Sequence, residues 1–145
     1  MRAALFLALL CACGAAAAQA PTPVGLWKTY SDRTGEADGL VRITEANGEL
    51  EGTVVKVFSP PAASANPLCE ECPGELRNQP VVGMKILRGM RLEGDAYTGG
   101  DILDPDEGKI YRCTLRLAAG GRKLEVRGYI GISLFGRTQV WDRVD

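Results

Sequence analysis

The chain has 145 residues, enough for one ordinary domain, and its hydrophobic content of 46% with 24% charged residues is typical of a folded protein. Lys and Arg number 17 and Asp and Glu 18, a balance that argues against a general binder of nucleic acids or anionic membranes. There is no histidine, which excludes Ser-His-Asp and Cys-His catalysis, a histidine general base and histidine-bound zinc.

Residues 1–18 have the pattern of a signal peptide. Arg2 supplies a positive charge, residues 3–12 are apolar, and an Ala-rich stretch follows. The apolar run is too short to cross a bilayer, which takes ~20 residues. Small residues predict cleavage after Ala18 or Ala20, and Ala18 is favoured because Pro21 would follow the second site. The remaining residues 19–145 are therefore predicted to be periplasmic or secreted.

Cys13 suggests an alternative fate for the exported chain, attachment to a membrane through a lipid. Residues 10–13 loosely resemble a lipobox, in which the cysteine becomes lipid-modified, although Cys11 is unusual inside such a box. Under this interpretation the protein is an outer-membrane lipoprotein anchored through Cys13.

Short apolar segments separated by turn residues fill the chain from residue 24 onward. Asn47-Gly48 is a strong hairpin signal, because both turn residues need a positive φ. The segments are residues 24–30, 40–46, 50–58, 81–87, 90–98, 100–103, 109–117, 124–130 and 138–144. About eight strands at this spacing predict an all-β fold, a single small antiparallel up-and-down barrel, because closure removes exposed edges.

Alternation along the segments predicts which side chains face the interior. In residues 109–117, one face carries Tyr111, Cys113, Leu115 and Leu117. The same pattern places Val41 and Ile43 inward, and also Leu124, Val126 and Ile130. One polar face and one apolar face for each strand indicate that all strands cover a single core.

A long Pro-rich loop, residues 59–80, interrupts the regular spacing and contains Cys69 and Cys72. In an oxidising compartment the pair is predicted to form a disulfide. A redox-active site is less well supported, since two acidic residues between the cysteines would raise the thiol pKa. A zinc site is not expected, because Cys113 brings the thiolates only to three. Cys113 is predicted to be a buried free thiol, with a bridge from the loop to Cys113 as the alternative.

Trp27 and Arg143 lie near the two ends of the domain. First and last strands are neighbours in small barrels, so the Arg143 guanidinium is predicted to cover Trp27 and close one barrel end. Contact of Trp27 or Trp141 with a ligand is the alternative.

Four acidic residues cluster around Pro105, and an apolar stretch connects the last two predicted segments. The acidic cluster, Asp101, Asp104, Asp106 and Glu107, is best interpreted as turn chemistry, with a calcium loop or a carboxylate pair for glycoside hydrolysis as alternatives. Residues 128–139 carry Tyr, Ile, Leu and Phe where a loop is expected. They either guard a ligand entrance or fold over the barrel end as a plug.

Several motifs, in order along the chain, resemble the bacterial domain of unknown function 2147 family. They are Gly25-Leu26-Trp27, Gly83-Met84-x-Ile86-Leu87, Gly99-Gly100-Asp101-Ile102-Leu103-Asp104-Pro105, Gly108-Lys109-x-Tyr111, Val126-Arg127-Gly128-Tyr129 and Gly136-Arg137-Thr138-Gln139-x-Trp141. The resemblance implies an exported bacterial protein with a lipocalin-like barrel and implies no activity. The Cys69-Glu70-Glu71-Cys72 loop also resembles one seen in part of that family.

The predicted function is binding of a small apolar ligand, such as a fatty acid or lipid fragment, inside the barrel. The side chains expected to line its cavity are Trp27, Val41, Ile43, Met84, Ile86, Tyr111, Leu115, Leu117, Leu124 and Val126. No cofactor, metal or nucleic acid is expected, the protein is expected to be a monomer, and no nucleophile–base pair indicates an enzyme. The alternatives are an envelope assembly protein with a filled barrel and residues 131–135 as its contact, or a thiol–disulfide enzyme using the Cys69–Cys72 pair.

Overall fold

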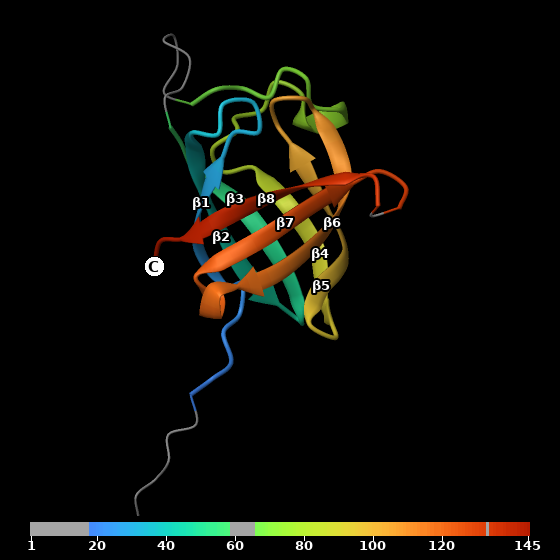
Figure 1. The fold of residues 1–145 in the computed structure, drawn as a ribbon. Helices are drawn as coiled ribbons and strands as arrows, with labels where there is room; N and C mark the ends of the chain where they lie inside the picture. Colours follow the sequence, from blue (N-terminus) through green and yellow to red (C-terminus); the bar gives the residue numbers. More distant parts are fainter. Residues whose placement is uncertain (1–17, 59–65, 133) are drawn as a thin grey trace, which may run out of the picture.

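Eight antiparallel strands close into a barrel in the computed structural model, which describes residues 18–58, 66–132 and 134–145 (Figure 1). The strands are β1 (Gly25–Tyr30), β2 (Ala37–Ala46), β3 (Glu49–Val57), β4 (Lys85–Glu93), β5 (Ala96–Asp104), β6 (Lys109–Ala118), β7 (Lys123–Tyr129) and β8 (Gly136–Arg143). Each strand pairs with its neighbour in the chain, and β1 also pairs with β8, with Trp27 opposite Arg143. The all-β, up-and-down barrel predicted from the sequence is therefore confirmed. Residues 1–17 of the predicted signal peptide, with Cys13 among them, lie outside the described residues, and cleavage after Ala18 or Ala20 stays a prediction.

Local sequence signals set most of the turns. Asn47 and Gly48 connect β2 to β3 with φ values of 55° and 76°, as the Asn-Gly hairpin signal predicts. In β6, Cys113 and Leu115 are buried and Ile110 is 43% exposed, so the alternation of this strand is confirmed. Ile130 differs from its prediction: it lies beyond the end of β7 and is 65% exposed.

The region around β4 and β5 corrects the predicted segments. Residues 81–87, 90–98 and 100–103 form two strands rather than three, and the turn between these strands lies at Gly94-Asp95. Gly89 and Gly99, with φ values of 69° and 82°, mark irregularities within the strands instead of turns. At Gly100 a Cβ would lie 2.0 Å from the Arg88 carbonyl oxygen. Gly100 therefore allows two backbones to approach closely, and the interpretation of Gly99-Gly100 as a bulge or bend within a strand agrees with this geometry.

The long β3–β4 connection packs against the barrel. The described part, residues 66–84, contains the short 3-10 helix η1 (Gly74–Leu76) and a bridge between Leu68 and Pro80. The Cys69 Sγ atom lies 3.3 Å from the Pro105 carbonyl oxygen, so the loop contacts the β5–β6 turn. A second 3-10 helix, η2 (Ala119–Gly121), joins β6 to β7. Within the described residues, no helix is long and apolar enough to span a membrane.

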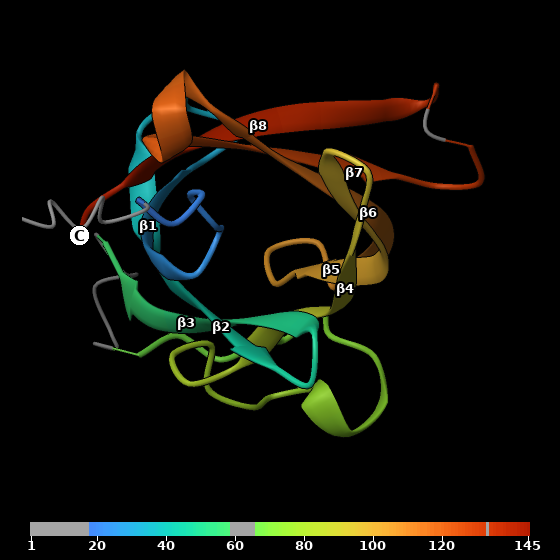
Figure 2. The ribbon, with the colours of Figure 1, turned by 90° about the horizontal axis from the view of Figure 1, so that it is seen from below.

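The interior is filled at one end of the barrel. Side chains that are completely buried pack together there, and the largest are Trp27, Ile43, Leu50, Leu87, Met90, Leu115 and Leu124. This is the end at which the chain enters β1 and at which η2 lies, seen from below in Figure 2. The opposite end, reached by the β1–β2, β5–β6 and β7–β8 connections, carries the site described next.

Candidate functional site

A cavity of about 1080 Å³ opens at the end of the barrel that the core leaves unfilled. Its walls come from all eight strands and from three connections between strands. Its inner wall is apolar and consists mainly of Val41, Val54, Val57, Ile86, Ile102, Tyr111, Val126 and Trp141. Trp141 is 2% exposed and its Nε1 donates a hydrogen bond of 2.9 Å to the Gln139 side chain. The barrel is therefore filled in one half and hollow in the other, with a volume suited to a small molecule.

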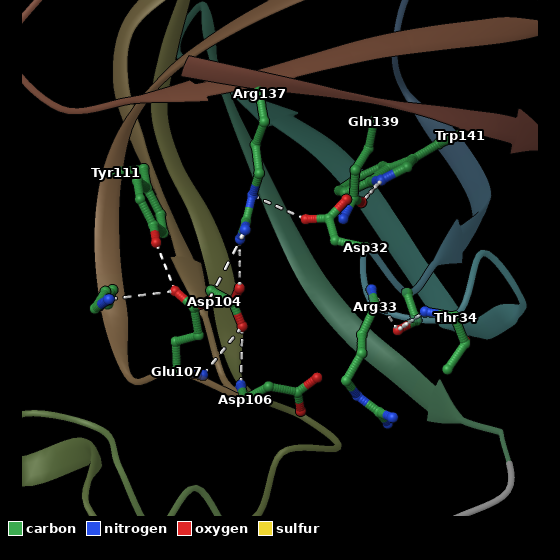
Figure 3. A network of polar contacts seen from close by, with 12 residues as sticks. Asp32, Arg33, Thr34, Asp104, Asp106, Glu107, Tyr111, Arg137, Gln139 and Trp141 are labelled. Carbon is green, nitrogen blue, oxygen red and sulfur yellow. Dashed lines mark hydrogen bonds and ion pairs between the residues drawn. The ribbon is translucent and has the colours of Figure 1, made fainter. Parts of the chain in front are cut away.

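Arg137 lines the cavity and lies in the middle of a network of polar contacts (Figure 3). It begins β8, and its side chain reaches two carboxylates from other elements: its Nε lies 2.8 Å from Asp32 in the β1–β2 turn, and its second terminal nitrogen lies 2.9 Å from Asp104 at the end of β5. The carboxylate of a third residue, Glu107, lies 3.9 Å from the other terminal nitrogen of Arg137. The centroid of the Tyr111 ring is 5.5 Å from the guanidinium carbon of Arg137. One guanidinium therefore links β8, the β1–β2 turn and the β5–β6 turn across the opening.

The β5–β6 turn is built to hold its carboxylates in place. Asp104 Oδ1 accepts hydrogen bonds from the backbone nitrogens of Asp106 at 2.9 Å and Glu107 at 3.3 Å, which is the turn chemistry predicted from the sequence. Its other oxygen is thereby left to face Arg137. Tyr111 donates a hydrogen bond of 2.6 Å to Glu107, and this bond lowers the pKa of Glu107 and raises the pKa of Tyr111.

Acidic side chains dominate the rim of the cavity. The residues around it include eight carboxylates and three basic groups, a formal excess of five negative charges. Burial is the largest cause that raises the pKa of Asp38, and nearby Asp106 and Asp32 raise it further. Burial also raises the pKa of Asp106, with Asp104 adding to the effect. Both shifts have the direction expected where negative charge is concentrated and partly withdrawn from water.

The acidic rim is not arranged as a metal centre. Among residues 18–58, 66–132 and 134–145, no three His, Cys, Asp or Glu side chains are grouped so that they could hold a metal ion. The ion pairs with Arg137 and the turn hydrogen bonds account for Asp104 and Glu107. The arrangement can attract a positive charge and exchange hydrogen bonds with a polar group at the cavity mouth.

Trp27 and Arg143 meet at the filled end, far from this mouth. The Arg143 guanidinium carbon lies 4.4 Å from the centroid of the Trp27 ring, and Trp27 is completely buried. Arg143 also donates hydrogen bonds to three backbone carbonyls, those of Thr22, Val24 and Gly121. Together these contacts join the amino-terminal segment, η2 and the last strand.

Comparison with known proteins shows that the chain matches a protein family. Residues 25–143 match the family described as uncharacterized proteins conserved in bacteria (DUF2147). The chain belongs to this family. The resemblance drawn from the sequence motifs is thereby confirmed, while the curated proteins compared with the chain give no match.

A solved structure shows the same fold as this DUF2147 protein. It is protein HP1028 from the human pathogen Helicobacter pylori, which belongs to the lipocalin family. The TM-score is 0.74 at 21% sequence identity, and the match covers 86% of this chain and 84% of that chain. The likeness confirms the lipocalin-like barrel and concerns the fold alone.

The predicted cavity residues of this DUF2147 protein divide between the cavity wall and the packed core. Val41, Ile86, Tyr111 and Val126 line the cavity. The other six lie outside its lining, packed in the core or against it: Trp27, Ile43, Met84, Leu115, Leu117 and Leu124. Alternation identifies an inward side chain but not its height along the barrel axis, which decides whether it meets another side chain or the hollow.

The cysteines of the described chain have two different environments. Cys69 and Cys72 form a disulfide, with their Cα atoms 5.4 Å apart, and both side chains are buried. Cys113 is a free cysteine with no exposed surface, and the bridge from the loop to Cys113 is not formed. Burial raises the pKa of Cys113 to about 12, so at neutral pH it is a thiol rather than a thiolate.

We expect Cys113 to resist alkylation in the folded protein. Iodoacetamide reacts with thiolates, and the buried Cys113 provides neither access nor charge. Mass mapping of the peptide that contains Cys113 should show almost no label after native treatment and full label after treatment in guanidinium. Rapid native labelling at this peptide would show that β6 opens readily.

Sequence reasoning missed two residues at the cavity mouth, Asp32 and Arg137. Arg137 appears in a family motif, but nothing local assigns its partners, because Asp32 and Asp104 are distant in the chain. The plug interpretation of residues 128–139 is wrong, since the described tip residues project into solvent while Arg137 and Gln139 face the cavity. Along β8, Arg137, Gln139 and Trp141 alternate with Thr138 and Val140. This alternation is the sequence signal that would have identified the residues of β8 that face the cavity.

Proposed function

We propose that this protein binds one small amphipathic molecule in the open half of its barrel. The cavity of about 1080 Å³ carries the proposal, because it joins an apolar inner wall to a polar mouth. The apolar part of the ligand lies against side chains such as Val54, Ile102 and Trp141. Burial of that part supplies most of the affinity, at roughly 25 cal/mol per Å² of apolar surface.

The charge of the mouth favours a ligand whose polar end is positive or neutral. The carboxylate of a fatty acid would approach an Arg137 that already faces Asp32, Asp104 and Glu107. It would also enter a rim with five more negative than positive groups. An ammonium group gains from the same field, so a cationic or uncharged amphiphile fits this site better than the fatty acid suggested by the apolar pattern alone.

Binding, rather than catalysis, is the proposed role. Asp104 and Glu107, the carboxylates considered for hydrolysis, are both held by hydrogen bonds and by Arg137. The Cys69–Cys72 disulfide is buried, which opposes the attack of an external thiolate. A disulfide-bonded barrel also supports export to the periplasm or beyond, the location that the leader sequence predicts.

A displacement experiment tests the charge preference directly. The fluorescent probe is N-phenyl-1-naphthylamine, which is neutral and brightens in apolar sites. Dodecyltrimethylammonium and dodecanoate, matched in chain length and used below their micelle concentrations, then compete for the cavity. We expect the cation to displace the probe at a concentration at least about fivefold lower, since one charge pair about 4 Å apart is worth about 1 kcal/mol even in water, which is about fivefold in affinity. Equal potency, or a preference for dodecanoate, would refute the cationic ligand.

Two tryptophan variants show whether the probe enters the cavity. Ile102→Trp adds bulk at the half-buried inner wall and should abolish probe binding. Val55→Trp adds the same bulk at a side chain that is 40% exposed on β3 and does not line the cavity, so binding should persist. Unchanged binding in Ile102→Trp would remove the barrel cavity as the binding site.

A further inference from the structure

The tip of the β7–β8 hairpin exposes large apolar side chains. Ile130, Ile132, Leu134 and Phe135 are between 60% and 75% exposed, and three of them are the most exposed large hydrophobic residues of the described chain. The Phe135 nitrogen donates a hydrogen bond of 3.1 Å to the Ile132 carbonyl, which closes the tip as a turn. Figures 1 and 2 both show this hairpin running out beyond the barrel wall. We call these four residues the apolar tip.

Basic and aromatic side chains stand behind the apolar tip on the outer face of the sheet. Arg112 pairs with Tyr129 on β7 and with Asp101 on β5. Two residues further from the tip, Arg127 pairs with Thr114 and donates a hydrogen bond of 3.0 Å to Thr138. Their neighbours Cys113 and Val126 are buried in the interior, so Arg112, Arg127 and Tyr129 point outward because side chains alternate along a strand. Arg112 is exposed and Arg127 is half-buried.

We propose that the apolar tip inserts into a lipid surface that carries anionic headgroups. Apolar side chains at the end of a projection, followed by a tyrosine and by arginines, match the layers of a membrane interface. The acyl boundary receives the tip, the headgroup region receives Tyr129, and the phosphates meet Arg112 and Arg127. The overall charge balance provides no general attraction to such membranes, so insertion of the tip carries the binding and the two arginines add a local attraction.

The shape of the projection favours a lipid surface over a protein partner. A stable protein interface takes about 800 Å² from each partner, arranged as a complementary patch. Four side chains at one narrow turn supply neither the area nor a groove, and two tips placed against each other would bury only these same residues. Insertion into lipid needs no complementary surface.

The apolar tip and the cavity belong to the same end of the barrel. Arg137 and Gln139 of β8 and Gly128 of β7 line the cavity, and the hairpin continues from these positions to the tip. The hairpin projects sideways beyond the barrel wall (Figures 1 and 2), so docking needs contact only at the tip and along the outer face of the hairpin, while the acidic cavity mouth stays clear of the anionic headgroups. The docking itself does not depend on the cavity being occupied.

Vesicle sedimentation tests the proposal. Full chains recovered from the envelope fraction of an expressing bacterium, all processed alike at the amino terminus, are mixed with phosphatidylglycerol–phosphatidylcholine vesicles or with pure phosphatidylcholine vesicles. We expect the wild type to bind the mixed vesicles and Phe135→Ser to bind at least about tenfold more weakly, because one large apolar side chain no longer leaves water. Leu92→Ser is the matched control: Leu92 is 61% exposed near the end of β4, at the filled half of the barrel, and its loss should leave binding unchanged.

A charge variant and a cavity variant separate the contributions. Arg112→Gln should weaken binding to the mixed vesicles about fivefold and leave binding to pure phosphatidylcholine unchanged. Ile102→Trp should bind vesicles like the wild type, so failure of the ligand proposal and failure of this one are distinguishable. The proposal is overturned if the wild type does not sediment with the mixed vesicles, if Phe135→Ser binds as Leu92→Ser does, or if the wild type is a dimer that Phe135→Ser dissociates without vesicle binding.

Discussion

Replacing Gly108 by alanine should destabilise the folded protein by about 3 kcal/mol or more. Gly108 closes the β5–β6 turn with a φ of 65°, and a Cβ there would lie 1.8 Å from the Glu71 carbonyl oxygen. That oxygen belongs to the backbone between the two bonded cysteines, so it has little freedom to retreat. Either the turn or the disulfide loop must shift, and the free energy of unfolding in urea, followed by tryptophan fluorescence, measures the cost.

Gly120→Ala is a matched control for this variant. Gly120 lies in η2 with the same φ of 65°, and a Cβ added there meets nothing within 4 Å. It should therefore lose only the backbone strain of a left-handed alanine, about 1 kcal/mol. The difference between the two variants is the cost of moving the β5–β6 turn and the disulfide loop apart to make room for the Cβ. Equal losses would mean that the turn or the loop shifts at no cost, so that the two are not held tightly together.

The barrel could be predicted from the sequence because the signals that indicate its strands and turns are local. An alternating pattern such as that of β6, and a turn signal such as Asn47-Gly48, each need only a few neighbouring residues to act. Short strands that each have one polar and one apolar face then favour closure of the sheet into a barrel, because closure leaves no exposed strand edges. Glycine is the weak point of this prediction, because the positive φ of Gly89 and Gly99 belongs to irregularities within strands, and the sequence does not distinguish such glycines from the glycines of a turn.

The site is harder to predict because its contacts are not local. Arg137 meets Asp104 across 33 positions of sequence, and Asp32 is farther still. These pairs depend on strand tilt and register, which bring the start of β8 over the end of β5. The division of the interior into a core and a hollow has the same origin: Leu115 and Tyr111 lie on one face of β6, yet one is packed in the core and the other lines the cavity.

Arg143→Ala should be among the most destabilising substitutions in the barrel, with a loss of about 3 kcal/mol or more in the free energy of unfolding. Its guanidinium donates to the carbonyls of Gly121 at 2.7 Å and Val24 at 2.9 Å, and also to that of Thr22. Hydrogen bonds to charged groups contribute about 1.5 to 3 kcal/mol each, and the contact with the Trp27 ring adds about 0.5 kcal/mol or more. Urea unfolding monitored by far-ultraviolet circular dichroism measures the loss without depending on tryptophan emission.

Two further substitutions decide whether the planar fork of Arg143 is what closes the filled end. Arg143→Lys keeps the positive charge but cannot reach three carbonyls and stack on Trp27 at once, so it should recover only a small part of the lost stability. Arg122→Ala removes an exposed guanidinium one residue beyond η2 and should change stability by less than about 0.5 kcal/mol. Recovery of wild-type stability by lysine would assign the effect to charge alone. A loss in Arg122→Ala as large as that in Arg143→Ala would mean that positive charge near η2, rather than the contact with Trp27, stabilises this end of the barrel.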